Sequence, residues 1–284
     1  METDEAPMNR WTTLFLSTLL TACGASAGAP QDVIAQSRAI GPLLGPAAGV
    51  NVFSCDDFMG GVDVEGPVAV ARNSSFKNFS VGRVTPGGNV LVVGEDLSLD
   101  SGTVWGSAVY GSLASVSGSV NFAAGGSAAK GSPIDFSAAC DELMQHSQLM
   151  AKQAENGTTL VQPWGAIELT GADPVLNVFS VNGADIDASH SLSITAPASS
   201  RVVVNVSGDR VSFAAFRFKY SGIDKTHVVY NFPVATWIEA TSVQFEGSVM
   251  APCGCFSCHD GNLEGGVGVM GVKGDCEYHH DPAI

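Results

Sequence analysis

The stretch FEGSVMAPCGCFSCHDGNLEGGVGV, residues 245–269, contains both a repeated motif and a cluster of cysteines. Its two E-G-x-V segments, 246–249 and 264–267, begin 18 residues apart, and a third copy stands at 65–68. A motif that recurs and contains glycine is typical of a solenoid, in which glycines allow the corners of successive coils. We therefore predict an all-β solenoid. The alternative is a β-sandwich, which also has many short strands with regular turns.

Short strand-like runs occupy most of the chain on both sides of the helix described below. They cover residues 62–70, 89–99, 103–111, 116–122, 176–181, 191–196, 201–208, 227–232 and 242–250. Alternating or short apolar runs bounded by glycine indicate strands. The run RVVVNVSG at 201–208 is nearly continuous in β-branched residues, which is typical of a strand covered on both faces.

One segment has a helical pattern instead. Ser132 is a suitable N-cap, Pro133 suits the first helical position, and residues 134–154 contain neither glycine nor proline. Apolar residues recur there at helical spacing, and Asn156-Gly157 ends the pattern. The sequence predicts a single helix over about 133–155, about 31 Å long.

The N-terminus predicts export. Residues 11–20 are a short apolar run, and a bilayer-spanning helix needs about 20 residues. The following Leu20-Thr21-Ala22-Cys23 resembles a bacterial lipobox, which would make Cys23 the lipidated first residue of the mature protein. Ordinary cleavage after an A-x-A pattern within 25–29 is the alternative. We assign 1–29 to a leader and short linker, 30–47 to a linker and 48–284 to one domain.

The charge balance excludes one class of partner. The net charge is −15, and charged residues make up only 14% of the chain. An acidic surface repels phosphate backbones, so we expect no nucleic-acid partner. Membrane contact is expected only through the lipid anchor, at a bacterial outer membrane or cell surface, or not at all if the protein is secreted.

The cysteines favour disulfides. Without Cys23 an even set remains, which in an exported chain favours pairing: Cys55, Cys140, Cys253, Cys255, Cys258 and Cys276. Cys258 and Cys276 are 18 residues apart, so adjacent coils would hold them about 4.8 Å apart. A disulfide accepts a Cα separation of about 4.4–6.8 Å. We expect this bridge to staple the last coil at an open sheet edge. Cys55 and Cys140 are a second candidate pair, linking the helix to the solenoid, and Cys253 and Cys255 stay unassigned.

Two other interpretations of the cluster are open. Cys255-Phe256-Ser257-Cys258-His259 matches the C-x-x-C-H pattern that attaches haem, with His279 or His280 as a second axial ligand. Alternatively, zinc ligands could come from a larger set: Cys253, Cys255, Cys258, His259 and Cys276. The motif has no helix to open, and the paired C-x-x-C spacing of strong zinc sites is missing. We therefore predict neither a metal nor a cofactor.

An ordered series of short motifs runs through about residues 48–284. It comprises NVF at 51–53, DF at 57–58, VEGPVA at 64–69, LVVGEDL at 91–97, IDF at 134–136, LTG at 169–171, LNVF at 176–179, NVSG at 205–208, NFP at 231–233, FEGSVMAP at 245–252 and EYHH at 277–280. The series resembles choice-of-anchor A domain proteins, which are exported bacterial surface proteins. The layout is similar to ice-binding-like adhesins, in which a right-handed β-helix is interrupted by one α-helix along its side. The resemblance implies an adhesive role without catalytic residues.

We therefore predict an exported, non-catalytic adhesion domain whose partner is a surface, a matrix or a glycan. One alternative is a carbohydrate-active β-helix enzyme, for which Asp56, Asp57 and Asp63 are the acidic candidates. A metal- or redox-active surface lipoprotein built on 253–259 is the other. Ice binding is disfavoured because the threonines are scattered.

Overall fold

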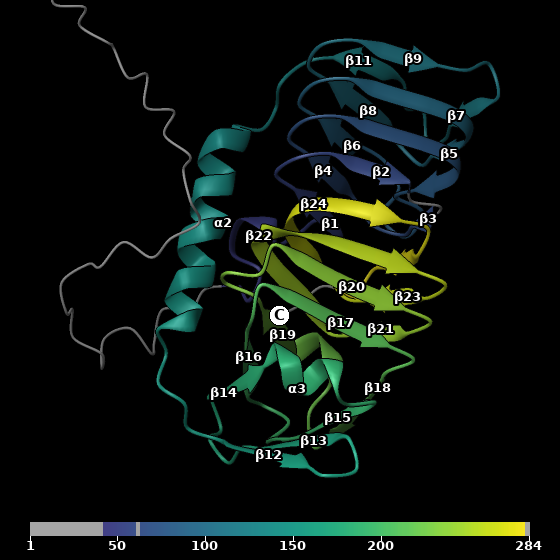
Figure 1. The fold of residues 1–284 in the computed structure, drawn as a ribbon. Helices are drawn as coiled ribbons and strands as arrows, with labels where there is room; N and C mark the ends of the chain where they lie inside the picture. The colour runs from purple at the N-terminus through teal and green to yellow at the C-terminus, as the bar shows by residue number, and fades with distance from the viewer. Residues whose placement is uncertain (1–41, 61–62, 282–284) are drawn as a thin grey trace, which may run out of the picture.

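The computed structural model describes residues 42–60 and 63–281. They are mostly β-structure, and 21 strands form one long sheet with parallel pairings. Figure 1 shows the strands stacked along one axis, with the longest helix lying alongside. The prediction of a mainly β fold is confirmed. Parallel pairing argues against the alternative of a β-sandwich, whose sheets are antiparallel.

The strands of successive coils pair in parallel and form three ladders, named here the helix-facing ladder, the flat ladder and the third ladder. The helix-facing ladder contains, in spatial order, β14 (Leu176–Asn182), β16 (Arg201–Ser207), β19 (Val228–Asn231), the first halves of β22 (Ser248–His259) and β24 (Val267–Gly274), β1 (Val52–Ser54), β4 (Val68–Val70), β6 (Asn89–Val93), β8 (Ser107–Tyr110) and β11 (Ala128–Lys130). The flat ladder contains β17 (Arg210–Ala214), β20 (Trp237–Thr241), the second halves of β22 and β24, β2 (Phe58–Gly60), the first halves of β5 (Ser74–Val81) and β7 (Leu97–Val104), and β9 (Ala114–Val116). The third ladder contains β21 (Gln244–Glu246), β23 (Asn262–Glu264), β25 (Glu277–His279), β3 (Asp63–Val64), the second halves of β5 and β7, and β10 (Val120–Phe122).

Smaller elements complete the fold. A separate four-stranded sheet contains β12 (Thr158–Gln162), β13 (Ala166–Thr170), β15 (Ser191–Thr195) and β18 (Arg217–Ser221). The helical elements are η1 (Gly45–Ala47), α2 (Phe136–Ala151), α3 (Gly183–Asp187) and η2 (Lys225–His227). Among the described residues, no helix has the length and apolar character needed to cross a membrane.

One column of side chains runs in register through all ten strands of the helix-facing ladder. Its members are Phe179, Val204, Tyr230, Val249, Val267, Val52, Val68, Leu91, Ala108 and Ala128. All except Ala128 are buried. The column includes the valine of each E-G-x-V segment, so the repeat marks an interior position. Apart from Val267 and Val52, which come from opposite halves of the chain, neighbouring members are separated by 16 to 26 residues, which explains why the repeat is faint in the sequence.

The two halves of the chain meet in the middle of the stack. β1 pairs with β24 on one side and with β4 on the other. The chain winds from this junction to one end, returns along the stack through α2, and winds back from the other end (Figure 1). The expectation that the last coil lies at an open edge is therefore wrong, because β24 is paired on both sides.

The main helix is shorter than predicted. α2 spans Phe136–Ala151, about 24 Å, instead of residues 133–155. Asp135, not Ser132, is the N-cap, and its side chain accepts a hydrogen bond from the Ala138 backbone nitrogen at 3.1 Å. The prediction of a single helix is also wrong, because α3 is a second, five-residue α-helix. Asn182 caps α3 in the same way, by accepting from the Ala184 nitrogen.

Strand β16 of the helix-facing ladder is buried on both sides, as the sequence of 201–208 predicted. Val202 and Val204 of β16 point into the coils, whereas Val203 packs on the other side in a cluster with Leu143 and Met150 of α2. All three valines are fully buried. Because α2 covers the outward side, polar residues are not needed at alternate positions of this strand.

Residues upstream of position 48 also belong to the packed structure. Leu43 and Leu44 are fully buried in the cluster between α2 and the helix-facing ladder. They lie within the segment 30–47 that the sequence assigned to a linker. The packed part of the chain therefore extends to the first described residues.

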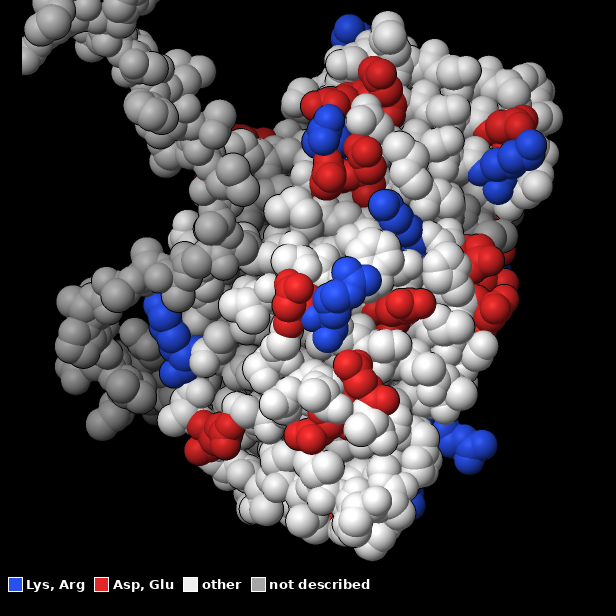
Figure 2. Space-filling view, in the orientation of Figure 1, with Lys and Arg blue, Asp and Glu red and all other residues white. Residues whose placement is uncertain are grey.

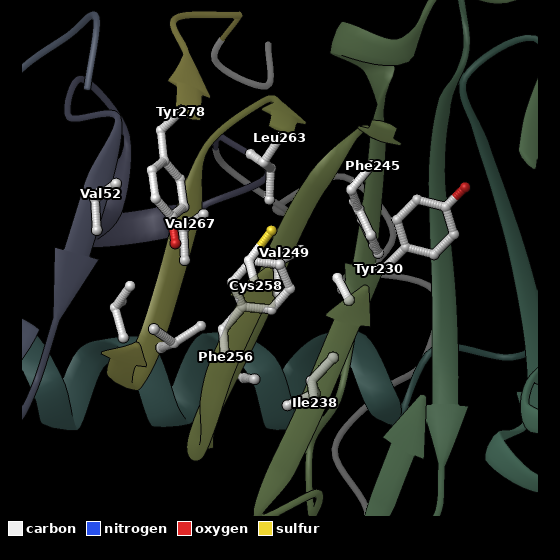
Figure 3. Close-up of a cluster of buried hydrophobic side chains, with 14 of the residues drawn as sticks. Val52, Tyr230, Ile238, Phe245, Val249, Phe256, Cys258, Leu263, Val267 and Tyr278 are labelled. Atoms are coloured by element: carbon white, nitrogen blue, oxygen red, sulfur yellow. The ribbon is translucent and has the colours of Figure 1, made fainter. Parts of the chain in front are cut away.

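The space enclosed by the coils is filled by apolar side chains. Figure 3 shows Phe256, Cys258, Leu263 and Tyr278 pointing into it from β22, β23 and β25. Aromatic rings interlock edge to face, as in the Phe245–Phe256 pair, whose ring centroids are 6.0 Å apart. This continuous core holds the coils together.

A buried polar network fixes α2 against the helix-facing ladder. Asn231 Nδ2 donates to the Ser147 carbonyl at 2.9 Å and to Asn205 Oδ1 at 2.8 Å. Ser147 Oγ donates to Asn231 Oδ1 at 2.6 Å, and Asn205 Nδ2 donates to the Met150 carbonyl at 3.0 Å. Because these groups are removed from water, each depends on the others for its hydrogen bonds.

Replacing Asn231 by alanine should lower the free energy of unfolding by about 2–3 kcal/mol, because Ser147 and Asn205 lose buried partners. The matched control is Asn121→Ala at an exposed position of β10, which should cost less than about 0.5 kcal/mol. Urea unfolding followed by circular dichroism measures both. Equal stability of the two variants would contradict a stabilising role for the network.

Candidate functional site

The outward side of the flat ladder presents a continuous column of side chains across eight strands. Its members, in spatial order, are Ser212, Glu239, Ser257, Lys273, Met59, Ser75, Ser98 and Ser115. All are at least partly exposed except Ser257, which is buried. With adjacent strands about 4.8 Å apart, the column is about 34 Å long. Most of its side chains are short, so the face is flat and can approach an extended partner closely.

A broad depression lies at the β9 end of this face. It has a volume of about 620 Å³ and lies over β2, β5, β7 and β9. Its lining combines apolar side chains, such as Met59 and Leu113, with the polar groups of Asn73, Asp96 and Ser98. Hydroxyl, amide and carboxylate groups of this kind can exchange hydrogen bonds with a polyhydroxylated partner.

Trp237, on β20, lies near the opposite end of the face. The Arg210 Cζ lies 5.4 Å from the centroid of its ring and the Lys273 Nζ lies 5.8 Å from it. Both distances are within the range of cation–π contacts, which is about 6 Å. A depression of about 210 Å³ adjoins the indole and is also lined by Asp187, Ser212 and Glu239.

Charge is distributed thinly on this side of the molecule. Figure 2 shows most of the surface as uncharged, with acidic and basic side chains in small separate groups. No extended basic patch is visible there, in keeping with the net charge of −15. The face is therefore suited to a polar ligand with few charges per unit length, in contrast to a nucleic-acid backbone.

Two disulfides form among the described residues, and both join cysteines that the sequence paired. Cys258 and Cys276 have Cα atoms 5.5 Å apart and lie in the core, where they join β22 to the residue before β25. Cys55 and Cys140, 5.8 Å apart at Cα, join the residue after β1 to α2. Two such bridges fit a protein that resides in an oxidising compartment.

The remaining cysteine cluster provides neither a haem site nor a zinc site. Cys258 is bonded to Cys276, so C-x-x-C-H attachment lacks one thiol. Cys253 is disulfide-bonded as well, which leaves Cys255 as the free thiol of the described residues. No group of three or more potential metal ligands comes together in that part of the chain. Burial raises the pKa of Cys255, which makes its thiol a poor nucleophile at neutral pH. The predicted lipidation site Cys23 lies outside the described residues.

A family model described as "Putative Ice-binding-like adhesive domain" matches residues 43–280. The chain belongs to this ice-binding-like adhesive domain family. The search of curated proteins found no match. The finer resemblance to choice-of-anchor A proteins stays a prediction.

Two solved structures are similar to the chain. One is an ice-binding protein from the Antarctic ascomycete Antarctomyces psychrotrophicus, with 15% identity, a TM-score of 0.43, and coverage of 84% of this chain and 99% of that chain. The other is an ice-binding protein from an Antarctic biological consortium, with 14% identity, a TM-score of 0.37, and coverage of 84% and 89%.

The acidic residues considered for an enzyme are used structurally in this adhesive domain. Asp57 Oδ1 accepts hydrogen bonds from the backbone nitrogen of Asn73 at 3.0 Å and from its Nδ2 at 2.9 Å. Asp56 forms an ion pair with Arg72 at 2.9 Å. Asp63 lies apart from them, on β3 of the third ladder. The three carboxylates are therefore not arranged as a catalytic group.

A feature that the sequence did not predict is an acid–base cluster on the third ladder. Glu264, only 8% exposed, accepts from Lys225 Nζ at 2.8 Å and from Asn262 Nδ2 at 2.8 Å. The Nδ1 of His279 lies 2.6 Å from Oε1 of the same Glu264 carboxylate. Lys225 also pairs with Asp281 at 2.7 Å. The sequence feature that could have indicated this cluster is the E-G-x-V segment at 264–267, whose glutamate is in register with His279.

These contacts determine the protonation of the cluster. Burial alone would raise the pKa of Glu264, but the hydrogen bonds from Lys225 and His279 outweigh burial and lower the pKa. Burial alone would lower the pKa of His279, but its hydrogen bond to Glu264 outweighs that effect and raises the pKa. The charged forms of both groups are therefore favoured in the folded protein.

The cluster predicts a pH window of greatest stability. The contribution of Glu264 is present above its ordinary pKa of 4.5 and is lost as the pH falls through its lowered pKa. The contribution of His279 is present below its ordinary pKa of 6.5 and is lost as the pH rises through its raised pKa. Both are complete between these two ordinary values. The melting temperature of the wild type should therefore decline above pH 6.5. The substitution His279→Gln should weaken this decline, whereas His190→Gln, at an exposed position, should leave it unchanged. An unchanged decline in His279→Gln would contradict this assignment.

Removing the Cys55–Cys140 bridge with a double alanine substitution should lower the free energy of unfolding by about 4 kcal/mol. The reason is that the bridge closes a separation of 85 residues, which restricts the unfolded chain. Guanidinium unfolding without reductant measures the loss, with Cys255→Ala as the control that breaks no bridge. A double variant as stable as the control would show that the bridge does not stabilise the fold.

Proposed function

We propose that the chain is an exported, non-catalytic adhesive domain that binds an extended surface or matrix ligand through the outward side of the flat ladder. The observation that carries this proposal is the in-register outward column, whose seven at least partly exposed members offer repeated contacts along one line. Membership of the ice-binding-like adhesive domain family and the two disulfides support it.

The physical advantage of this face is its rigidity. Backbone ladders hold every member of the column before a ligand arrives, so binding orders few protein groups and costs little conformational entropy. Individually weak contacts along an extended partner can then add up. Export through residues 1–29, lipid anchoring at Cys23 and the right-handed winding implied by the family resemblance are further parts of this proposal.

The column also favours a polar macromolecule over ice. Glu239 and Lys273 stand in the same line as the serines. Charged groups hold their own hydration shells and interrupt a uniform hydroxyl surface. Hydrogen bonding to a polysaccharide tolerates such groups, because sugar hydroxyls both donate and accept.

Binding of the intact purified chain to immobilised cellulose, chitin, dextran and polygalacturonate tests this function. At least one of these polymers should retain the protein, and Ser98→Arg should weaken that binding at least tenfold by placing a long charged side chain on the face. The matched control is Asn121→Arg on the third ladder, which should bind like wild type.

A reducing-sugar assay on the same polymers separates adhesion from catalysis, and an ice-recrystallisation assay separates it from ice binding. The proposal expects no turnover and no inhibition of recrystallisation. Polysaccharide cleavage, retention by none of the polymers, or equal losses in the two arginine variants would overturn it.

A further inference from the structure

We infer that the depression beside Trp237 binds an acidic sugar unit of a polysaccharide. This inference rests on the proposed adhesive function, and it names the ligand class and the part of the flat face that selects it. It is carried by a depression lined by the Trp237 indole, Arg210 and hydrogen-bonding groups, with Lys273 as a second basic side chain against the same ring.

The indole supplies the surface on which a sugar ring can pack. Trp237 points outward from β20, because Ile238 and Ala240 take the alternate, inward positions and are fully buried. It is in register with Arg210 on one neighbouring strand and with Cys255 on the other. A partly exposed aromatic ring held by a ladder is a flat apolar platform, which suits the C–H face of a pyranose.

The two basic groups beside the ring select for negative charge. Neither Arg210 nor Lys273 forms an ion pair within residues 42–60 and 63–281. The guanidinium of Arg210 can hold a carboxylate with two parallel hydrogen bonds. In a chain with a net charge of −15, two unpaired cations at one indole are available for an anionic group.

The remaining groups of the depression match the hydroxyls of a sugar. Asp187 and Glu239 offer carboxylate oxygens as acceptors, and Ser212 offers a hydroxyl that can donate or accept. Asp187 is held in place because its Oδ1 accepts a hydrogen bond from the Ser212 backbone nitrogen at 2.6 Å. The volume of about 210 Å³ limits the depression itself to a small unit, while the open flat face allows a polymer to continue past it.

The two cations come from different coils but meet at one ring. Arg210 is on β17 and Lys273 is on β24, three strands away, yet the Arg210 Cζ and the Lys273 Nζ lie 5.4 Å and 5.8 Å from the same Trp237 centroid. A carboxylate on a sugar that packs on this ring is therefore close to a basic group. The acidic surface elsewhere repels a polymer with one charge per sugar less than it would a denser polyanion.

The test compares polygalacturonate with its fully methyl-esterified form, which has the same chain without the charge. Isothermal titration of the intact protein should show at least tenfold tighter binding to polygalacturonate. Trp237→Ala should weaken binding to both polymers at least tenfold, because the platform is lost. Arg210→Gln should remove the preference for the acid while leaving binding to the ester unchanged.

Matched controls come from the same chain. Trp164→Ala removes a tryptophan that is 65% exposed in the turn between β12 and β13, and Arg217→Gln removes an exposed arginine of β18. Both should bind like wild type. Circular dichroism of each variant confirms that a loss of affinity is not a loss of fold.

The outcomes separate this inference from the proposed function. Equal affinity for the two polymers, or wild-type affinity in Trp237→Ala, would overturn the acidic-sugar site. If Ser98→Arg still weakens binding in that case, the adhesive face stands without this ligand. Failure of every polymer to bind would overturn both.

Discussion

The pairing of β1 with β24 is the contact on which the rest of the structure depends. It places a strand from the start of the domain between one from its end and β4, so the stack is continuous only when both halves of the chain are present. Asn51, just before β1, reinforces the junction. Its Nδ2 donates to the carbonyls of Gly265 at 2.8 Å and His279 at 3.0 Å, and its Oδ1 accepts from the Gly66 nitrogen at 3.0 Å. One buried amide therefore ties together segments more than 200 residues apart in the sequence.

This topology explains what could be predicted from the sequence and what could not. The recurring E-G-x-V motif indicated a solenoid, and the structure places its valines in one interior column; the Cys258–Cys276 pair followed from coil spacing. The junction could not be predicted, since it joins distant segments and leaves no local signal. The same holds for Asn231 and Asn205, which are ordinary polar residues in the sequence and become a buried network only when α2 lies against them. Trp237 was also missed as a site, because its cationic neighbours come from other coils.

At one corner beside the flat ladder, Asp and Asn side chains of successive coils form a series of hydrogen bonds. Asp57 accepts from the Asn73 backbone nitrogen, Asn73 Oδ1 accepts from the Asp96 nitrogen at 3.2 Å, and Asp96 Oδ1 accepts from the Leu113 nitrogen at 3.1 Å. Each Asp or Asn side chain thus caps the backbone of the next coil. The next residue in this series is Leu113, which is 71% exposed and has no side-chain group that accepts a hydrogen bond. The series therefore ends at the coil of β9, where α2 begins the return path.

The outward columns are regular because they follow from the same strand register as the interior columns. Strands alternate sides, so every residue that enters an interior column places its neighbour in an outward column at the same spacing. Since α2 covers the helix-facing ladder, the flat ladder remains open. At the junction, Lys273 from the C-terminal half stands directly beside Met59 from the N-terminal half. The two depressions lie on opposite sides of this point, one near Trp237 and one near β9. A ligand that spans the face must therefore contact both halves of the chain, so its binding and the closure of the β1–β24 junction stabilise one another.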